Sequence, residues 1–238
     1  MGELKVKDKD IVGPGEVLAV GMDYLPAGGA YRDNDSVVAS QVGIVSINGR
    51  LVKIVALNSK YAPRKGDTVI GKVIDISSSI WVLNINHAND AILPLRDGSN
   101  DYIPRGADLR QYYDFDDYVV ATVTKVINGG TVEISMKGPG LRKLSEGRIL
   151  KVNPAKIPRI IGREGSMVSM VKGSTDCRII AGQNGIVWIS GANPEKEIIA
   201  VEAIKMIEEN AHRQGLTDEV KKFLDNKIGD KNGVQQKE

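Results

Sequence analysis

A loop with two glycines three residues apart, Gly162-Arg-Glu-Gly165, carries the residues of this chain best placed to do chemistry. Glycine permits a sharp turn and lets a polyanion backbone approach the main chain closely. The apolar run after the loop predicts a helix whose unpaired amides and positive dipole end face the loop. The surrounding segment 148–172 holds six basic residues and a single acid, Glu164. This pattern predicts contact with phosphate groups; a helix–turn–helix joint without a ligand, with a solvated basic face, is the alternative.

The elements expected around the loop agree with this prediction. Residues 147–152 form a predicted strand before the first helix, and Asn184-Gly185 lies between two apolar runs, which is a strong hairpin signal. Asn193-Pro194-Glu195 then offers an N-cap, a proline at the first helical position and an acid in the first turn of a long helix. Strand, helix, glycine loop, helix, hairpin and long helix follow in the order of a KH RNA-binding module, which this segment resembles.

Five further strands are predicted in the middle of the chain. A long polar loop, 96–117, with one helical turn near 107–112, separates the third of them from the fourth. Five strands with a long connection at this place predict an OB barrel. The stretch 138–145 after the barrel is expected to be a linker. The predicted strands are 67–76, 80–85, 91–95, 118–127 and 131–136.

The two ends of the chain carry no motif with chemistry. Short strands with glycine turns are predicted at the start, most clearly a hairpin over 42–55 around Asn48-Gly49, and such a piece favours a docking or capping role. At the other end, Thr217 is expected to cap a short helix, 218–228, and the polar residues 230–238 are expected to be disordered. We therefore predict an α+β multidomain protein with a small N-terminal β domain at 1–62, an OB β-barrel at 63–140 and a C-terminal KH α/β domain at 141–238.

Composition narrows the class of protein. The formal net charge is only +2, and Cys177 is the single cysteine, so no intrachain disulfide can form. The two histidines, His87 and His212, have no Cys or His neighbours at ligand spacing, and we expect neither a metal nor a cofactor. No apolar run approaches the length of a membrane span, and the first residues lack a signal-peptide core. A soluble cytoplasmic protein is expected.

Several short motifs point to one family. Gly71-Lys-Val-Ile-Asp-Ile76, Trp81-Val-Leu83 and Ala91-Ile-Leu93 resemble the S1-type OB fold of RNA-binding proteins. With Gly182-Gln-Asn-Gly185 and the opening Ile11-Val-Gly-Pro-Gly-Glu-Val-Leu18, their order resembles the RNA-binding cap subunits of the archaeal exosome. The resemblance implies a non-catalytic protein, three copies of which sit on a six-membered ring of RNase-PH-type subunits. There it would bind single-stranded RNA at the pore and feed 3′ ends inward for 3′-to-5′ degradation.

The KH-like loop departs from many relatives at one position. Many KH loops carry a basic residue where Glu164 stands, and a carboxylate beside phosphates opposes binding. Arg163 can offset this charge or pair with it. Clamping of the RNA backbone and packing both stay open as roles for the loop. The residues predicted to bind RNA in this domain are Lys156, Arg159, Gly162, Arg163, Glu164, Gly165 and Lys172.

The S1-like segment departs as well. In many S1-type domains an aromatic residue, a glycine and a histidine occupy the positions of Ser78, Ser79 and Pro94. Because stacking of a base on an aromatic side chain is worth ~1–3 kcal/mol, the S1-type surface is expected to bind RNA less tightly than a stacking platform. Trp81 is either a stacking residue or a partly buried barrel residue, and the loop arginines either line a pore or are ordinary loop charge. The residues predicted to bind RNA here are Lys72, Trp81, Arg96, Arg105 and Arg110.

Two other functions compete with the exosome subunit. A free-standing single-stranded RNA-binding protein in translation or RNA regulation is the alternative, although such a protein has no need of a β domain without RNA-binding chemistry. A nuclease acting alone would need clustered carboxylates with a metal or an acid–base pair. The only acidic cluster, Asp114, Asp116 and Asp117, is expected to be solvated or to dock a basic partner, so we predict no enzyme.

Overall fold

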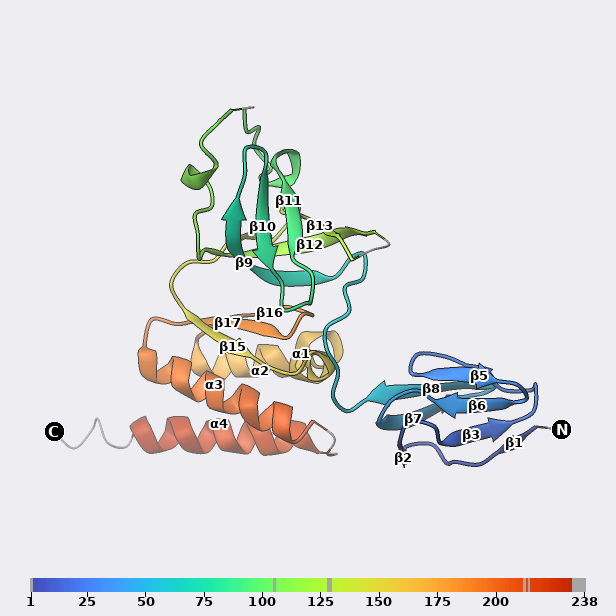
Figure 1. Cartoon of the computed structure of the whole chain (residues 1–238). Helices are drawn as coiled ribbons and strands as arrows, with labels where there is room; N and C mark the ends of the chain where they lie inside the picture. The colour runs from blue at the N-terminus through green and yellow to red at the C-terminus, as the bar shows by residue number, and fades with distance from the viewer. Residues whose placement is uncertain (1, 105, 128–129, 212, 214, 233–238) are drawn as a thin grey trace. The chain divides into compact units, whose positions relative to one another are not determined.

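The computed structural model describes residues 2–104, 106–127, 130–211, 213 and 215–232. The chain divides into two compact units, Met1–Ser59 and Lys60–Glu238 (Figure 1). Each unit has cores of its own, and the second contains both the barrel and the KH-type domain. Within the described part of the chain, no helix is long and apolar enough to cross a membrane.

The first unit is built from two small antiparallel sheets with one mixed edge. The clearest predicted hairpin is confirmed, but its two turn residues are Gly49 and Arg50, because Asn48 still pairs with Leu51. Gly49 takes the positive φ that this tight turn requires. The sheets have the orders β1 (Glu3–Leu4), β3 (Val17–Val20), β6 (Ser36–Ala39), β5 (Ala30–Asp33) and β2 (Ile11–Val12), β7 (Gly43–Asn48), β8 (Leu51–Ala56), β4 (Leu25–Pro26).

The second unit opens with a closed five-stranded barrel. Its strands pair in the order β9, β10, β11, β13, β12, and β12 returns to β9. The parallel β11–β13 pair closes the barrel across the long connection, as an OB fold requires. All five strands lie where the alternation of the sequence predicts them. Their bounds are β9 (Thr68–Ile76), β10 (Ile80–Asn84), β11 (Ala91–Pro94), β12 (Tyr118–Val126) and β13 (Val132–Ser135).

Two stretches predicted as loop or linker contribute to the barrel. The expected linker after the barrel contains a short strand, β14 (Arg142–Lys143), which pairs with β12, so this prediction was wrong in part. The long connection includes the turns η1 (Leu95–Asp97) and η2 (Leu109–Gln111), the latter at the predicted position. Ile103, Leu109 and Tyr113 are buried in the barrel core. The connection is therefore tied to the barrel by apolar side chains and is not simply a polar loop.

The KH-type domain has the predicted order of elements. A three-stranded sheet, β15-β17-β16, packs against α1, α2 and α3, and a further helix, α4, packs on α2 and α3 (Figure 1). Ile157, Ile160, Val171, Ala203 and Ile204 are among its buried residues. The elements are β15 (Arg148–Lys151), η3 (Pro154–Lys156), α1 (Ile157–Ile161), η4 (Arg163–Gly165), α2 (Ser166–Thr175), β16 (Arg178–Ala181), β17 (Ile186–Ser190), α3 (Pro194–Glu209) and α4 (Leu216–Asn232).

The last helix differs from its prediction at both ends. It begins at Leu216, directly after Gly215, so Thr217 lies in the first turn and is not the cap. Leu216 is fully buried, and this apolar anchor sets the start of the helix. The helix continues to Asn232, beyond the predicted end at Ile228 and into the polar stretch expected to be disordered. The rest of that stretch, 233–238, lies outside the described residues.

Asn184 joins the barrel to the KH-type sheet. Its side chain is fully buried. Its Nδ2 donates hydrogen bonds to the carbonyls of Ile70 (2.8 Å) and Ile85 (2.9 Å), and its Oδ1 accepts one from the amide of Ile70 (3.2 Å). A Cβ at the neighbouring Gly182 would lie 2.9 Å from the same amide nitrogen, so only glycine allows this approach. A side chain from the β16–β17 hairpin thus completes hydrogen bonding in the barrel.

An apolar cluster adds to this joint. Ile70 and Val120 of the barrel pack with Leu144, Ile186 and Trp188 from the KH side, and all five residues are buried. The indole Nε1 of Trp188 donates a hydrogen bond to the carbonyl of Ser145 at 3.3 Å. Burial of these side chains favours one arrangement of the barrel and the KH-type domain within the second unit.

Candidate nucleic-acid interface

The Gly-x-x-Gly loop makes a tight left-handed turn between α1 and α2. Gly162 has φ +77° and ψ 175°, Glu164 has φ +54° and Gly165 has φ +79°. Three of the four loop residues therefore have backbone angles that L side chains rarely adopt, and one of the three is a glutamate. The amide of Gly165 donates to the carbonyl of Gly162 at 3.3 Å and closes the turn.

The two glycines face different surroundings. A Cβ at Gly162 would lie 2.7 Å from both the amide nitrogen and the Cβ of Met167, in the first turn of α2. At Gly165 the nearest such atom is the Oγ of Ser169, at 4.0 Å. Close packing would therefore exclude a side chain at Gly162 whatever its backbone angles, whereas the space beside Gly165 is open. The packing role kept open by the sequence applies at Gly162, and a ligand could approach at Gly165.

Three predicted cations lie on the segments next to this loop, and a fourth, Lys172, lies in the last turn of α2. Lys156 precedes α1, Arg159 lies on α1, Arg163 lies in the loop and Lys172 lies on α2. Arg159, Arg163 and Lys172 are exposed and Lys156 is half-buried. The Nη2 of Arg159 donates to the carbonyl of Arg213 at 3.0 Å, beyond the end of α3, which fixes its guanidinium beside the loop helices.

Arg163 and Glu164 form no ion pair among the described residues, and both side chains are exposed. Of the two possibilities left by the sequence, that Arg163 pairs with Glu164 or merely offsets its charge, the structure favours the second. The carboxylate remains available to oppose an approaching phosphate.

Trp81 is not a stacking residue. Its side chain is fully buried in the barrel core, where its ring meets Tyr113 edge-on at 5.2 Å between centroids. Its indole Nε1 donates to the carbonyl of Tyr113 at 3.1 Å, and the ring packs against Gly98. The prediction that Trp81 binds RNA is therefore wrong, because no face of the ring is open to a base.

The other residues of the barrel domain that were predicted to bind RNA differ in the contacts that their side chains make within the protein. Lys72 lies on β9 with its Nζ 2.6 Å from Asp116, which raises the pKa of the ammonium through a hydrogen bond and charge attraction. The Arg96 side chain is 76% exposed, with Nε 3.1 Å from Asp97. Arg110 lies over the ring of Phe115 at 5.5 Å. Arg105 lies outside the described residues.

Two carboxylates of the acidic cluster form ion pairs with lysines of the same chain. Asp116 pairs with Lys72, and Asp117 pairs with Lys143 of β14. A carboxylate oxygen of Asp117 also accepts from the amide of Asp114 at 2.7 Å, so this cluster shapes the turn before β12. Among the residues that the structure describes, no group of three His, Cys, Asp or Glu side chains could hold a metal ion.

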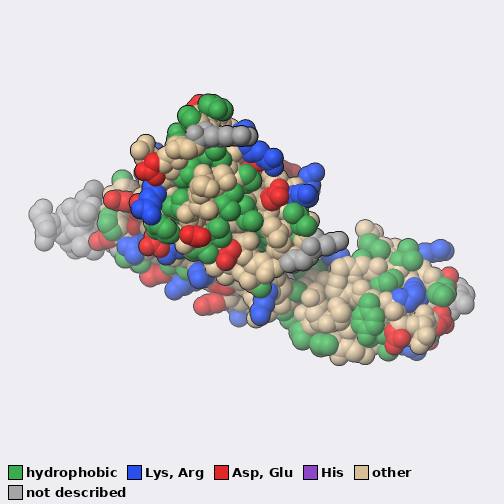
Figure 2. Space-filling model, turned by 45° about the horizontal axis from the view of Figure 1, so that its top comes forward, with side chains coloured by type: hydrophobic (Ala, Val, Ile, Leu, Met, Phe, Trp, Pro, Cys, Tyr) green, Lys and Arg blue, Asp and Glu red, His purple; other side chains and the backbone are tan. Residues whose placement is uncertain are grey.

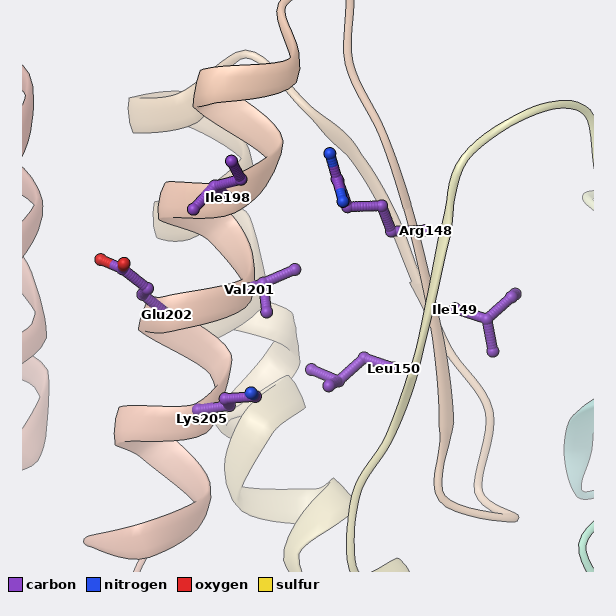
Figure 3. A pocket seen from close by; sticks show the side chains of 7 residues that line it. All are labelled: Arg148, Ile149, Leu150, Ile198, Val201, Glu202 and Lys205. Atoms are coloured by element: carbon purple, nitrogen blue, oxygen red, sulfur yellow. The ribbon is translucent and has the colours of Figure 1, made fainter.

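A groove of about 520 Å³ lies between β15 and α3. Figure 3 shows Arg148 and Leu150 pointing across it toward α3, while Ile149 points the other way. Arg148 pairs with Glu197 at 2.9 Å and Glu202 pairs with Lys227 at 2.9 Å, so much of its charge is neutralised. Lys156, Arg159, Arg163 and Lys172 do not line this groove. The groove therefore suits apolar groups better than phosphate. Its lining residues are Arg148, Ile149, Leu150, Ile198, Val201, Glu202 and Lys205.

Known proteins match the chain over nearly its whole length. Residues 60–125 match the family model described as RRP4, S1 domain, and residues 147–195 match a KH domain model. The exosome complex component Rrp4 of Methanothermobacter thermautotrophicus is 39% identical over 235 residues, which cover 99% of this chain and 74% of that protein. The chain belongs to the Rrp4 family of exosome components. The Rrp4 of Picrophilus torridus is also 39% identical, over 94% of this chain and 96% of that protein.

A solved structure agrees with the Rrp4 assignment. The crystal structure of a protein described as a candidate exosome complex RNA-binding protein has a TM-score of 0.64 and 32% identity. It covers 71% of this chain and 97% of that one. The predicted family is thus confirmed, as is the predicted combination of an N-terminal β domain, an S1-type barrel and a KH domain.

Sequence reasoning missed two structural roles in this Rrp4-family chain. Lys72 and Lys143 converge on the acidic turn from strands far apart in sequence, and no local signal marks that pairing. Asn184 was recognised as a hairpin residue of a family motif, but its contacts with the barrel were not predicted. Its neighbour Gly182 supplied the available signal, since a glycine before Asn-Gly is unnecessary for the turn itself.

Proposed function

We propose that this protein is a non-catalytic RNA-binding subunit of an exosome, which caps an RNase-PH-type ring and guides RNA 3′ ends into its pore for 3′-to-5′ degradation. The observation that carries the proposal is membership of the Rrp4 family across 99% of the chain, with an S1 and a KH module in one unit. Three copies would sit on each ring, and the complex would act in the cytoplasm.

A docking role for the first unit is supported by its exposed apolar side chains. Ile11, Ile44 and Val55 are directly paired across β2, β7 and β8, so they form one row on the outer face of this sheet. Ile11 is 69% exposed and Val55 is 46% exposed. Figure 2 shows hydrophobic side chains at several places on the surface of the first unit, with charged side chains between them. Contiguous exposed apolar surface of this kind is typical of protein contacts.

A non-catalytic role is supported by the state of the acidic cluster. Phosphodiester cleavage needs a free base or a metal held by carboxylates. Here Asp116 and Asp117 are paired with Lys72 and Lys143. Such ion pairs serve the structure of the turn and leave little room for acid–base chemistry.

Weak, salt-dependent RNA binding is supported by the cations of the second unit. Arg163 is exposed in the Gly-x-x-Gly loop, Lys172 is exposed in the last turn of α2, and Arg96 is exposed on the long connection of the barrel. A few phosphate contacts give an affinity that falls with salt by ~0.7 log units per contact for each log unit of salt.

Degradation assays test the proposal. Labelled single-stranded RNA is incubated with the purified protein, with RNase-PH-type ring proteins, and with both, in the presence of magnesium and phosphate. The protein alone should leave the RNA intact, and its addition to the ring should increase RNA capture and processivity. RNA cleavage that co-purifies with the chain and is lost on changing Asp114, Asp116 and Asp117 to Asn would contradict the proposal. RNA binding without any effect on the ring would favour a free-standing RNA-binding protein.

A further inference from the structure

The long connection of the barrel holds one segment, 98–103, between two fixed points. At one end the carbonyl of Gly98 accepts a hydrogen bond from the Tyr113 hydroxyl at 2.6 Å, and Gly98 packs on the buried Trp81 ring. At the other end Ile103 is buried in the barrel core. The amide of Met136 also donates to the carbonyl of Asp97 at 2.8 Å, just before the segment. The intervening residues are therefore held in place although they lie at the surface.

Tyr102 lies in this segment and is 86% exposed, directly beside the buried Ile103. Among the described residues its ring has no aromatic or cationic partner. Figure 1 shows that the connection, in green, extends at the end of the barrel away from the KH helices. An amphipathic ring that is presented on an anchored backbone and buries little of its own surface is well suited to an external partner.

The residues around Tyr102 indicate which chemical groups such a partner would carry. A pocket of about 590 Å³ has an apolar floor from Leu95 and Ile103 and two cations, Arg96 and Lys137. Asn100 adds a side-chain amide that can donate and accept hydrogen bonds. The one acid is Asp101, which opposes an anion and limits its affinity. The full lining is Leu95, Arg96, Asn100, Asp101, Tyr102, Ile103 and Lys137.

We propose that this pocket binds one nucleotide of single-stranded RNA, with its base stacked on Tyr102 and its phosphate beside Arg96 and Lys137. The proposal rests on the proposed function and names the site that the S1-type barrel uses. The two positions where many S1-type domains carry an aromatic residue and a histidine hold Ser78 and Pro94, and Trp81 is buried, so the stacking group is displaced onto the long connection. Stacking tolerates any base, because every base has a π-face.

Equilibrium binding by the full-length protein tests the site. The probe is a short oligoribonucleotide with one 2-aminopurine, whose fluorescence falls when the base stacks, measured at low salt. Tyr102→Ala should weaken binding about fivefold or more and remove the fluorescence change, whereas Tyr102→Phe should keep both. Arg96→Gln should weaken binding and reduce the salt slope. The matched control is Tyr31→Ala in the first unit, where the tyrosine is 47% exposed, and it should change nothing.

The outcomes separate this site from the wider function. Wild-type binding that Tyr102→Ala leaves unchanged would overturn the pocket while the proposed function stands. Equal losses in Tyr102→Phe and Tyr102→Ala would also overturn it, since stacking needs only the ring. No binding by the wild-type protein, alone or with the ring, would overturn both proposals. Thermal unfolding of each variant confirms that an exposed side chain was changed without loss of fold.

Discussion

At the scale of single residues, the two glycines of the loop show how one backbone angle can serve different purposes. Gly162 and Gly165 have φ angles of +77° and +79°. Only at Gly162 would a Cβ meet the backbone of α2, at 2.7 Å from the Met167 nitrogen. Both positions would be strained on substitution, but Gly162, with ψ 175°, lies in a region open almost only to glycine, whereas Gly165, with ψ 9°, is in the left-handed helical region. Crowding is confined to Gly162.

Alanine substitution at each glycine should show how much more a side chain destabilises the protein at Gly162 than at Gly165. Gly165→Ala should lower the free energy of unfolding by about 1–2 kcal/mol, the cost of a left-handed angle for an L residue. Gly162→Ala should lower it by about 1–3 kcal/mol more, because the added methyl meets Met167 and because alanine adopts the backbone angles of Gly162 less readily. Denaturant unfolding of both variants measures the difference. Equal losses would mean that the loop relaxes away from Met167 and that Gly162 has no packing role.

Asn184 is the second residue whose substitution is informative. Asn184→Ala leaves the amide of Ile70 and the carbonyls of Ile70 and Ile85 unpaired in a buried place. Each unpaired buried group costs about 1–3 kcal/mol, so the loss of the three hydrogen bonds together should lower stability by about 3 kcal/mol or more. The matched control, Asn193→Ala at the exposed N-cap of α3, should cost about 1 kcal/mol. Similar losses for the two variants would contradict the role of Asn184 in joining barrel and KH domain.

At the scale of elements, α2 presents its N-terminal turn and the Gly-x-x-Gly loop together, with Glu164 as the one acid there. Asp176 lies at the other end of the same helix, is exposed and also has a positive φ, +55°. The two acids are therefore comparable in exposure and backbone angle and differ in their distance from the loop along α2, although Asp176 also lies 4.0 Å from the ammonium of Lys196. Any effect of overall charge on RNA binding should be the same for both.

Glu164→Lys should strengthen binding of single-stranded RNA and steepen the salt slope by up to ~0.7, the value for one added phosphate contact. Asp176→Lys makes the same change in charge and should leave affinity nearly unaltered. Fluorescence anisotropy at low salt measures both, with thermal unfolding recorded beside it. If Glu164→Lys binds no better than Asp176→Lys, the loop acts as a packing joint and does not clamp RNA.

The elements also show what the sequence could predict and what it could not. The barrel strands and the hairpin at Asn184-Gly185 follow from alternation and turn residues, which are local signals, and they were predicted correctly. The strand β14 was predicted as linker, because it exists only through pairing with β12. The burial of Trp81 likewise depends on Gly98 and Tyr113, which come from the long connection. Long-range contacts of this kind leave no periodic trace in the sequence.

The candidate site likewise combines features that the sequence predicts with features that it does not. The Gly-x-x-Gly turn and the exposure of Arg163 and Lys172 agree with expectation, since short basic helices next to a glycine turn place charged side chains outward. The pairing of Lys72 with Asp116 was not foreseen, because the two residues meet only through tertiary structure. Tyr102 was also missed, since exposure of a loop aromatic depends on how its neighbours are anchored.

At the scale of the whole molecule, we propose docking for the first unit and RNA binding for the second. The first unit offers the apolar row of Ile11, Ile44 and Val55, and the second unit offers the cations and the barrel pocket. A charge placed in the row should prevent docking without changing RNA binding by the protein alone. Val55→Asp is the variant of choice, and Ile74→Asp, which replaces a 40% exposed strand residue of the second unit, is its matched control.

The mass of the complex formed with RNase-PH-type ring proteins tests the central claim most directly. Light scattering after size-exclusion chromatography should show the protein and the ring in one species, with a mass that corresponds to three copies of the chain on each ring. Val55→Asp should weaken this association about tenfold or more, because an unpaired carboxylate would be desolvated in the interface, and Ile74→Asp should assemble normally. Elution of the wild-type protein apart from the ring, at every concentration tested, would contradict the account.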